Sequence, residues 1–317
     1  MSNINYSLDF ELNDNNFLSN LFGIDDKNIQ IIEKNNNVKI KYRGNKIKII
    51  GSKTSIKDTK EEILILFEEA KKGVNIDEDK IMETRSLKLL EISPDEQMNL
   101  FFQTKKRKIL PRTKNQKNYF QLLNTKDIVF AYGPAGTGKT FLAVAKAVAS
   151  LQKGLVNKII LSRPAVEAGE KLGFLPGDLK EKVDPFLRPI YDALYDMMPY
   201  DQVEKKIANN IIEIAPIAFM RGRTLENCYI ILDEAQNTTK IQMKMFLTRL
   251  GKNSKMVVVG DNTQIDLISK SDSGLIDAAK KLKNIEDIGF IELDNKDVVR
   301  HEVVRKIINA YEEKNRN

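Results

Sequence analysis

The sequence predicts an α/β protein in which a buried parallel sheet carries helices on both faces, joined to a smaller α+β unit at the N-terminus. From about residue 111 onward, short apolar runs alternate with helical patterns, which is typical of parallel strands buried on both faces. One such run precedes a glycine-rich octapeptide, and another ends in Asp-Glu. Before residue 72, apolar residues alternate instead with lysines, which indicates an antiparallel hairpin.

The composition fits a globular chain of about two domains. The 317 residues are 42% hydrophobic and 30% charged, with one cysteine, Cys228, and one histidine. No apolar run approaches the roughly 18 residues that a membrane span needs, and no leader pattern is visible at the start. We therefore expect a cytoplasmic protein without a membrane segment or disulfides, and we expect any metal to be Mg²⁺ held by oxygen ligands.

The first region, residues 1–72, reads β-α-α-β-β-α. We expect a strand at 7–12, helices at 17–22 and 28–34, a hairpin through 38–42 and 47–49, and a helix at 56–70. This order resembles the KH module, in which a G-x-x-G loop between the first two helices binds a nucleic-acid backbone. Here that place carries Gly23-Ile-Asp-Asp26, with no second glycine and two carboxylates. We expect a KH-like fold with a degenerate or absent clamp, and RNA binding through this loop is the alternative.

A connector at residues 73–110, acidic and then basic, leads to the third region, residues 111–317. Between Lys105 and Lys117 lie seven cations and no acidic residue. The run is either a solvated surface or a contact for phosphates. The net charge of +7 also permits a polyanionic partner, although a biased genome explains the abundant lysine equally well. In the third region we expect strands at 128–132, 158–162, 211–215, 229–232, 256–259 and 288–293.

The octapeptide at residues 133–140 spells G-x-x-x-x-G-K-T between an apolar run and a helical pattern, the context of a phosphate-binding loop. Its glycines let backbone N–H groups wrap a polyphosphate, and the following helix presents its positive end. Lys139 would reach the β- and γ-phosphates, and the Thr140 hydroxyl would bind Mg²⁺. An ordinary glycine turn is the alternative. The residues expected to hold ATP here are Gly133, Pro134, Ala135, Gly136, Thr137, Gly138, Lys139 and Thr140.

Three further polar elements complete the expected site. Asp233 and Glu234 end an apolar run, so Asp233 would bind Mg²⁺ and Glu234 would orient or deprotonate the attacking water; a surface pair or a helix cap is the alternative. Gln264 follows another strand and would sense the γ-phosphate, unless it belongs to a polar turn. Gln116, upstream of the loop, has an amide that matches the edge of adenine.

Phosphoryl transfer also needs cations beyond Lys139 and Mg²⁺. Arg300 is our first candidate for an arginine finger, the residue that stabilises charge on the γ-phosphate. His301, the single histidine, is expected to be structural rather than catalytic. The other candidate arginines are Arg163, Arg221, Arg223 and Arg249.

Together these residues resemble the PhoH-like ATPase family over most of the chain from about residue 105. The more specific stretches are Leu172-Gly-Phe-Leu-Pro-Gly177 and Met220-Arg-Gly-Arg-Thr224. The resemblance implies a cytoplasmic, Mg²⁺-dependent ATPase with a RecA-like P-loop core, similar to the first motor domain of superfamily 1 helicases. It also implies a role in RNA metabolism, in some members ribosomal RNA maturation beside a small endoribonuclease. The N-terminal unit resembles the extension of the bacterial branch with a single ATPase domain.

The chain departs from helicases because it has one phosphate loop and no second core. We therefore expect either a homo-oligomer, such as a ring whose neighbour supplies the missing face, or a switch. The leading hypothesis is ATP hydrolysis coupled to RNA binding or remodelling. The alternative is a nucleotide-gated adaptor that recruits a ribonuclease or ribosomal partner and hydrolyses ATP slowly and independently of RNA. A small-molecule kinase is a third class, disfavoured because no acceptor pocket is identifiable.

Overall fold

The computed structural model describes residues 6–90, 100–164, 179–267 and 272–298, without the side chains of residues 89 and 179–187. The chain divides into two compact units, Met1–Gln97 and Met98–Asn317, and the boundary falls inside the segment expected to be a connector. Among the described residues, no helix is both long enough and apolar enough to cross a membrane.

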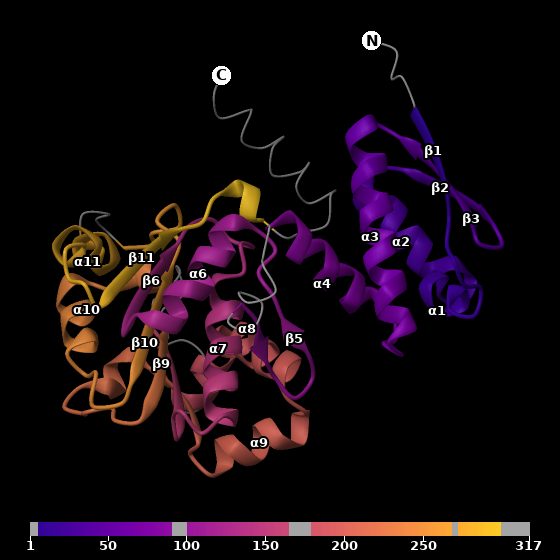
Figure 1. Cartoon of the computed structure of the whole chain (residues 1–317). Coiled ribbons are helices and arrows are strands. Elements are labelled where there is room, and N and C mark those ends of the chain that lie inside the picture. The colour runs from indigo at the N-terminus through magenta and orange to yellow at the C-terminus, as the bar shows by residue number, and fades with distance from the viewer. Residues whose placement is uncertain (1–5, 91–99, 165–178, 268–271, 299–317) are drawn as a thin grey trace. The chain divides into compact units, whose positions relative to one another are not determined.

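The N-terminal unit contains the expected order of strands and helices, followed by one more helix in the segment expected to be a connector (Figure 1). The KH-like assignment itself stays a prediction. The elements are β1 (Tyr6–Glu11), α1 (Leu18–Phe22), η1 (Ile24–Asp26), α2 (Lys27–Asn36), β2 (Lys39–Arg43), β3 (Lys46–Gly51), α3 (Lys53–Lys71) and α4 (Glu78–Leu89).

The three strands of this unit form an antiparallel sheet in the order β1-β3-β2. A two-residue turn joins β2 to β3, and Gly44 takes φ 58° there, a conformation that glycine adopts at low cost. Ile47 and Ile49 of β3 point into a core shared with the helices, whereas Lys46 and Lys48 lie on the opposite, exposed face. Within residues 6–90, the helices therefore pack on one face of this sheet.

The loop between α1 and α2 has the two carboxylates that the sequence indicated. Asp25 and Asp26 have φ 51° and 59°, left-handed values that are unfavourable for side chains other than glycine. Asp26 accepts a hydrogen bond from the Tyr42 hydroxyl, and the Ile24 side chain is 87% exposed. One carboxylate of this loop is thus engaged within the unit.

The C-terminal unit is built on a parallel sheet in the order β11-β6-β10-β9-β7-β8, which confirms the predicted α/β class. Its strands are β6 (Ile128–Tyr132), β7 (Lys158–Arg163), β8 (Ile212–Pro216), β9 (Cys228–Leu232), β10 (Lys255–Gly260) and β11 (Ile288–Glu292), with a small hairpin of β4 (Phe102–Gln103) and β5 (Lys108–Ile109). Its helices are α6 (Lys114–Thr125), α7 (Lys139–Gln152), α8 (Leu179–Met197), α9 (Tyr200–Ala208), α10 (Lys240–Leu247) and α11 (Gly274–Leu282), with short turns η3 (Ile217–Met220), η4 (Ala235–Asn237) and η6 (Asn295–Asp297).

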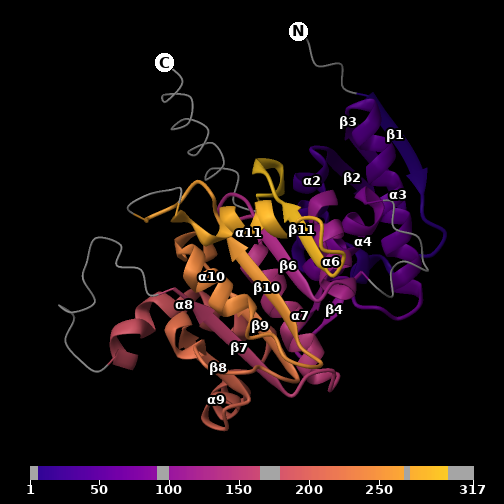
Figure 2. The ribbon, with the colours of Figure 1, turned by 90° about the vertical axis from the view of Figure 1, so that its left-hand side faces the viewer.

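Helices cover both faces of this parallel sheet (Figures 1 and 2). On one face, α10 and α11 pack through Met243, Phe246 and Leu275 against sheet residues such as Ile230 and Val258. On the other face α6 and α7 lie against the strands, and α8 packs on α7. Because the strands are buried from both sides, they read in the sequence as continuous apolar runs.

The basic run at residues 105–117 is largely exposed, but some of its cations have partners from elsewhere in the C-terminal unit. Lys105 Nζ donates to Gln202 Oε1 at 2.8 Å, and Lys106 Nζ donates to the Tyr195 carbonyl. Arg107 forms an ion pair with Asp196 on α8 at 2.8 Å. The run contains no acid of its own, but the fold brings amide, carbonyl and carboxylate partners to Lys105, Lys106 and Arg107 from α8 and α9. A contact of this run with phosphates stays a prediction.

Candidate functional site

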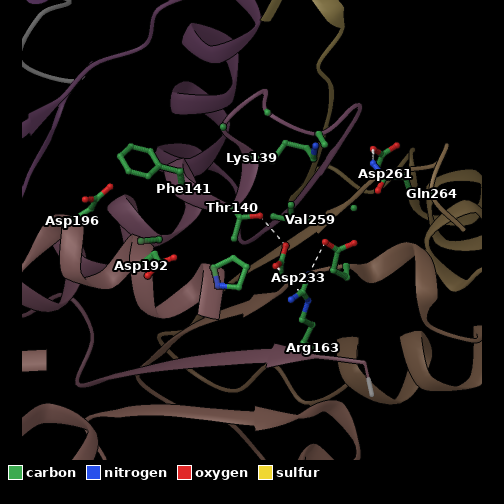
Figure 3. Close-up of a pocket in the computed structure, with 17 residues that line it drawn as sticks. Lys139, Thr140, Phe141, Arg163, Asp192, Asp196, Asp233, Val259, Asp261 and Gln264 are labelled. Carbon is green, nitrogen blue, oxygen red and sulfur yellow. Dashed lines mark hydrogen bonds and ion pairs between the residues drawn. The ribbon is translucent and has the colours of Figure 1, made fainter. Parts of the chain in front are cut away.

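The polar residues that follow four of the parallel strands meet at one edge of the sheet. In a parallel sheet the carboxyl ends of all strands lie on the same side, and ligands bind in the crevice outside them. A cavity of about 460 Å³ opens at this edge, a size typical of small-molecule sites. Its lining includes Lys139, Thr140, Arg163, Asp233, Glu234 and Gln264 (Figure 3).

The backbone of the glycine-rich loop has the shape of a phosphate cradle. Gly133, Gly136 and Gly138 take φ 142°, 85° and 85°, values that side chains other than glycine rarely adopt. A Cβ atom on Gly133 would lie 2.0 Å from the Leu293 carbonyl oxygen, so only glycine fits there. Gly138 caps α7 without a side-chain hydrogen bond, which leaves N–H groups of the first helical turn for an anion.

The ammonium group of Lys139 lies inside this loop. Its Nζ donates to the carbonyls of Gly133 (2.7 Å) and Pro134 (2.8 Å) and lies 3.3 Å from Thr137 Oγ1. The residue is only 8% exposed, and burying a cation is costly unless an anion or hydrogen bonds compensate it. Backbone carbonyls carry only partial charge, so a polyphosphate in the cradle is the stronger partner for this group.

Thr140 and Asp233 form the oxygen pair expected of a magnesium site. Thr140 Oγ1 donates to Asp233 Oδ1 at 2.7 Å, and Asp233 is 5% exposed. Burial raises the pKa of the Asp233 carboxyl above its ordinary value, and the nearby Arg163 and the Thr140 hydroxyl offset part of that rise. A hydroxyl beside one carboxylate fits Mg²⁺, which binds proteins through few oxygen ligands together with substrate phosphates and water.

Glu234 stands at the exit of β9 in a strained conformation. Its φ of 53° is left-handed, which costs a residue with a side chain roughly 1–2 kcal/mol. Strain of this kind concentrates at functional sites. Arg163 Nη2 donates to Glu234 Oε1 at 2.7 Å, and Arg163 Nε lies 3.7 Å from Asp233 Oδ2. The candidate general base is thus held by an arginine from the end of β7.

Gln236 is a site residue to which the sequence analysis gave no role. Its fully buried side chain donates from Nε2 to Glu234 Oε2 (2.5 Å) and to the Gln264 carbonyl (3.1 Å). Its Oε1 accepts from the Asp261 N–H at 3.0 Å. The amide therefore links the candidate base to the segment after β10. The available signal was its place in Asp-Glu-Ala-Gln, two residues after Glu234.

Gln264 lies at the rim of the cavity, where the sequence placed it. Its Nε2 donates to Asp261 Oδ2 at 2.6 Å, and Asp261 is buried. The exposed Gln264 side chain is therefore held on a carboxylate at the edge of the cavity, beside the loop that would hold the γ-phosphate (Figure 3).

Gln116 contacts the backbone of the phosphate loop. The buried side chain donates from Nε2 to the Thr137 carbonyl at 3.0 Å, and its Oε1 accepts from the Arg112 N–H at 2.8 Å. Tyr119, one turn later on α6, donates to the Lys139 carbonyl at 3.3 Å. Both side chains fix the loop from α6. An amide retains a second donor and a second lone pair, so the adenine role of Gln116 stays a prediction.

The candidate arginines occupy different places. Arg163 lines the cavity, whereas Arg223 pairs with Glu213 and Arg249 donates to the carbonyls of Met245 and Arg223. Arg221 is exposed and makes no side-chain hydrogen bond or ion pair with the described part of the chain. Arg300, the first candidate for the finger, and His301 lie outside the described residues, as does the whole Leu172–Gly177 stretch.

A phosphate cradle, a hydroxyl–carboxylate pair and a strand-end glutamate on a parallel sheet define the chain as a P-loop NTPase-like protein. Comparison with known proteins assigns the chain to one family within this class. The family model described as PhoH-like protein matches residues 108–312, more than half of the chain. The chain belongs to the PhoH-like family.

Individual relatives agree with this assignment. The PhoH-like protein of Bacillus subtilis (strain 168) is 50% identical over 299 residues, covering 93% of this chain and 94% of the relative. The PhoH-like protein of Mycobacterium tuberculosis (strain ATCC 25618 / H37Rv) is 57% identical over 220 residues, 69% of this chain and 62% of the relative. Protein PhoH of Escherichia coli (strain K12) is 44% identical over 205 residues, 64% of this chain and 58% of the relative.

Proposed function

We propose that the protein is a cytoplasmic, Mg²⁺-dependent ATPase that hydrolyses ATP to ADP and phosphate and couples this reaction to RNA binding or remodelling. The observation that carries the ATPase proposal is the contact between Thr140 and Asp233 beside Glu234 and the phosphate cradle. A cation, an oxygen pair suited to Mg²⁺ and a carboxylate base are the parts that phosphoryl transfer requires.

In the proposed reaction, the loop N–H groups and Lys139 bind the β- and γ-phosphates. Thr140 and Asp233 would hold Mg²⁺, which neutralises charge on the phosphates when bound. A water oxygen attacks the γ-phosphorus while the bond from that phosphorus to the β,γ-bridging oxygen breaks, and ADP leaves with the electron pair. Glu234 orients this water and accepts its proton.

Arg163 gives this site a resting arrangement that must change before turnover. Its guanidinium holds Glu234 at 2.7 Å, and a carboxylate bound in this way has one oxygen less for water. The triphosphate of ATP carries more negative charge than the Glu234 carboxylate, so bound ATP would compete with Glu234 for the Arg163 guanidinium. We propose that Arg163 moves from Glu234 towards the γ-phosphate, which supplies a cation and frees the base in one step.

Gln236 would then couple the position of the Glu234 side chain to the segment after β10 at the rim of the cavity. Through one buried amide, Glu234 is connected to the Gln264 carbonyl and the Asp261 N–H. We propose that loss of the γ-phosphate shifts this connection and moves the segment after β10. That segment is where a second copy of the chain, in a ring or another homo-oligomer, would complete the site, with Arg300 or the exposed Arg221 as the finger.

The RNA part of the proposal rests on the net charge of +7 and on the resemblance to a family associated with RNA metabolism, including ribosomal RNA maturation. The test is steady-state ATP hydrolysis with and without single-stranded RNA at several salt concentrations. Stimulation that fades as salt rises is expected, because phosphate contacts release counterions. Hydrolysis that no RNA changes at any salt concentration would remove RNA from the function.

A nucleotide-gated adaptor is the second candidate function. The described part of the chain holds one P-loop unit, and part of the basic run is engaged by α8 and α9, which weakens the case for RNA there. Such an adaptor would hydrolyse ATP slowly, and its ATP-bound form would recruit a ribonuclease or ribosomal partner. Slow hydrolysis that RNA does not change, together with partner capture in ATP but not in ADP, distinguishes it from the RNA-coupled enzyme.

A further inference from the structure

The exposed face of the N-terminal sheet has a regular arrangement of charge. The strand register places Glu11, Lys46 and Arg43 in one row across the three strands. The next row is Asp9, Lys48 and Lys41, and the third is Ser7, Ile50 and Lys39. Side chains alternate between the two faces of a strand, so these rows share the face opposite to the core.

The cations on β3 have acidic partners on this face. Lys46 Nζ lies 3.1 Å from Glu11 Oε1, and Lys48 Nζ lies 3.7 Å from Asp9 Oδ2. On the edge strand β2, Lys39 Nζ lies 3.6 Å from Glu33 Oε2, whereas Lys41 and Arg43 have no such partner within residues 6–90. The acids thus lie along β1, and the edge formed by β2 carries excess positive charge.

This placement has an energetic cost within the unit. Lys41 lies directly opposite Lys48, and Arg43 lies directly opposite Lys46. Like charges directly opposite each other destabilise a sheet. Two adjacent rows carry this repulsion, and no acid of the described unit relieves it on the β2 side. An external anion on this face would turn the repulsion into attraction.

The same face of the sheet is hollowed. A hollow of about 520 Å³ lies over the three strands, and four cations and two acids are among the residues that line it: Lys41, Arg43, Lys46, Lys48, Asp9 and Glu11. The aromatic rings of the two outer strands belong to the other face, where Phe10 packs against the core and Tyr42 against Phe22. Protein interfaces are enriched in aromatic residues and depleted of lysine, so this face does not suit a protein partner.

We infer that the exposed sheet face of the N-terminal unit binds the phosphate backbone of single-stranded RNA, with Lys41 and Arg43 as the main contacts. The inference rests on the proposed coupling to RNA and assigns that coupling a surface. Because Phe10 and Tyr42 of the described strands direct their rings to the core side, the proposed contact is with phosphates and is independent of base sequence. Lys46 and Lys48 would join it by turning from Glu11 and Asp9, since exposed ion pairs are weak.

The test measures binding of the full chain to a fluorescein-labelled single-stranded oligouridylate by fluorescence anisotropy at several salt concentrations. The variant is Lys41→Ala/Arg43→Ala. The matched control is Lys34→Ala/Lys53→Ala, which removes two exposed cations of the same unit from α2 and α3. We expect the first variant to bind about tenfold more weakly at low salt, with a log–log salt slope shallower by about 1.4, twice the value of about 0.7 for one contact to a single strand.

Further measurements separate a binding role from a structural one. The thermal midpoint of the first variant should equal or exceed that of the wild type, because the like-charge rows are relieved. Lys41→Arg/Arg43→Lys keeps both charges and should bind as the wild type does. Equal affinity of the first variant and the control, or a loss of affinity that follows a loss of folded protein, would overturn the inference.

The outcomes also distinguish this inference from the proposed function. If RNA stimulates hydrolysis and the first variant binds RNA as the control does, the coupling stands and its surface lies elsewhere. If the wild type binds no RNA, both the coupling and the inference fail, while the ATPase proposal is unaffected. Binding to phosphatidylserine vesicles without binding to RNA would likewise overturn the assignment of RNA to this face.

Discussion

Two arginine–glutamate pairs lie at the same sheet of the C-terminal unit, and they are held differently. Arg223 meets Glu213 on β8 with both nitrogens, Nη1 to Oε1 at 2.5 Å and Nη2 to Oε2 at 2.9 Å, and Lys158 adds a contact at 2.6 Å. Arg163 Nη2 donates to Glu234 Oε1 at 2.7 Å, and the other glutamate oxygen, Oε2, accepts from the Gln236 amide.

The difference shows how one chemical pair serves two purposes. The hydrogen bonds from Arg223, followed by those from Lys158, lower the pKa of Glu213 to about 2, so this carboxylate is fully committed to its partners. Glu234 stands in a strained backbone conformation beside the cavity, and its arginine is shared with Asp233. The first pair has the contacts of a structural ion pair, and we propose that the second exchanges partners.

The largest expected effect separates the two glutamates. Glu234→Gln should lower the rate of ATP hydrolysis by about 10²–10⁴-fold, the usual contribution of a general base, while ATP binding is retained. Glu213→Gln is the matched control and should leave the rate per folded molecule unchanged. Single-turnover hydrolysis and nucleotide binding, measured side by side, check both. Wild-type turnover by Glu234→Gln would show that another group accepts the proton.

A smaller effect is expected when the arginine of the exchangeable pair is removed. Arg163→Ala should lower kcat by about 10–100-fold, because a cation that moves to the γ-phosphate is lost, with a thermal midpoint close to that of the wild type. Arg163→Lys keeps the charge without the planar fork and should recover part of the rate. A loss confined to KM, with kcat unchanged, would place Arg163 in ATP binding and contradict its exchange from Glu234.

The smallest effect should be one of stability alone. Arg223→Ala should reduce the free energy of unfolding by about 1–2 kcal/mol at neutral pH, a value discounted from the pKa shift because both side chains are partly exposed. A carboxyl with a lowered folded pKa stabilises above its unfolded pKa of about 4.3 and loses that contribution as pH falls towards about 2. The difference between wild type and variant should therefore shrink between these values.

Urea unfolding of both proteins across that acid range measures this difference, with ATP hydrolysis at neutral pH as the control. A difference that stays constant with pH would mean that Arg223 stabilises by packing rather than by its charge. A large fall in kcat for Arg223→Ala, with the folded fraction unchanged, would instead return Arg223 to the candidates for the arginine finger.

The parallel sheet was predictable because its strands are buried on both faces and therefore appear as apolar runs. The predicted strand at 128–132 agrees with β6 in both bounds. The motifs predicted that Thr140 and Asp233 would lie together, and Thr140 Oγ1 is 2.7 Å from Asp233 Oδ1. The partners of long polar side chains were not predictable. Arg107 forms an ion pair with Asp196, and Gln236 accepts a hydrogen bond from the Asp261 N–H. Such contacts depend on positions in the fold that no local sequence pattern encodes.

The left-handed backbone at Glu234 has a consequence for how this protein can change over time. Glycine would adopt that conformation at little cost, so replacing Glu234 with glycine would relieve strain while removing the proposed base. Selection for thermal resistance alone would therefore favour an inactive chain at this position. If Glu234 is the base we propose, stability and turnover oppose each other at this position, and a glutamate that persists under such selection is retained for the reaction.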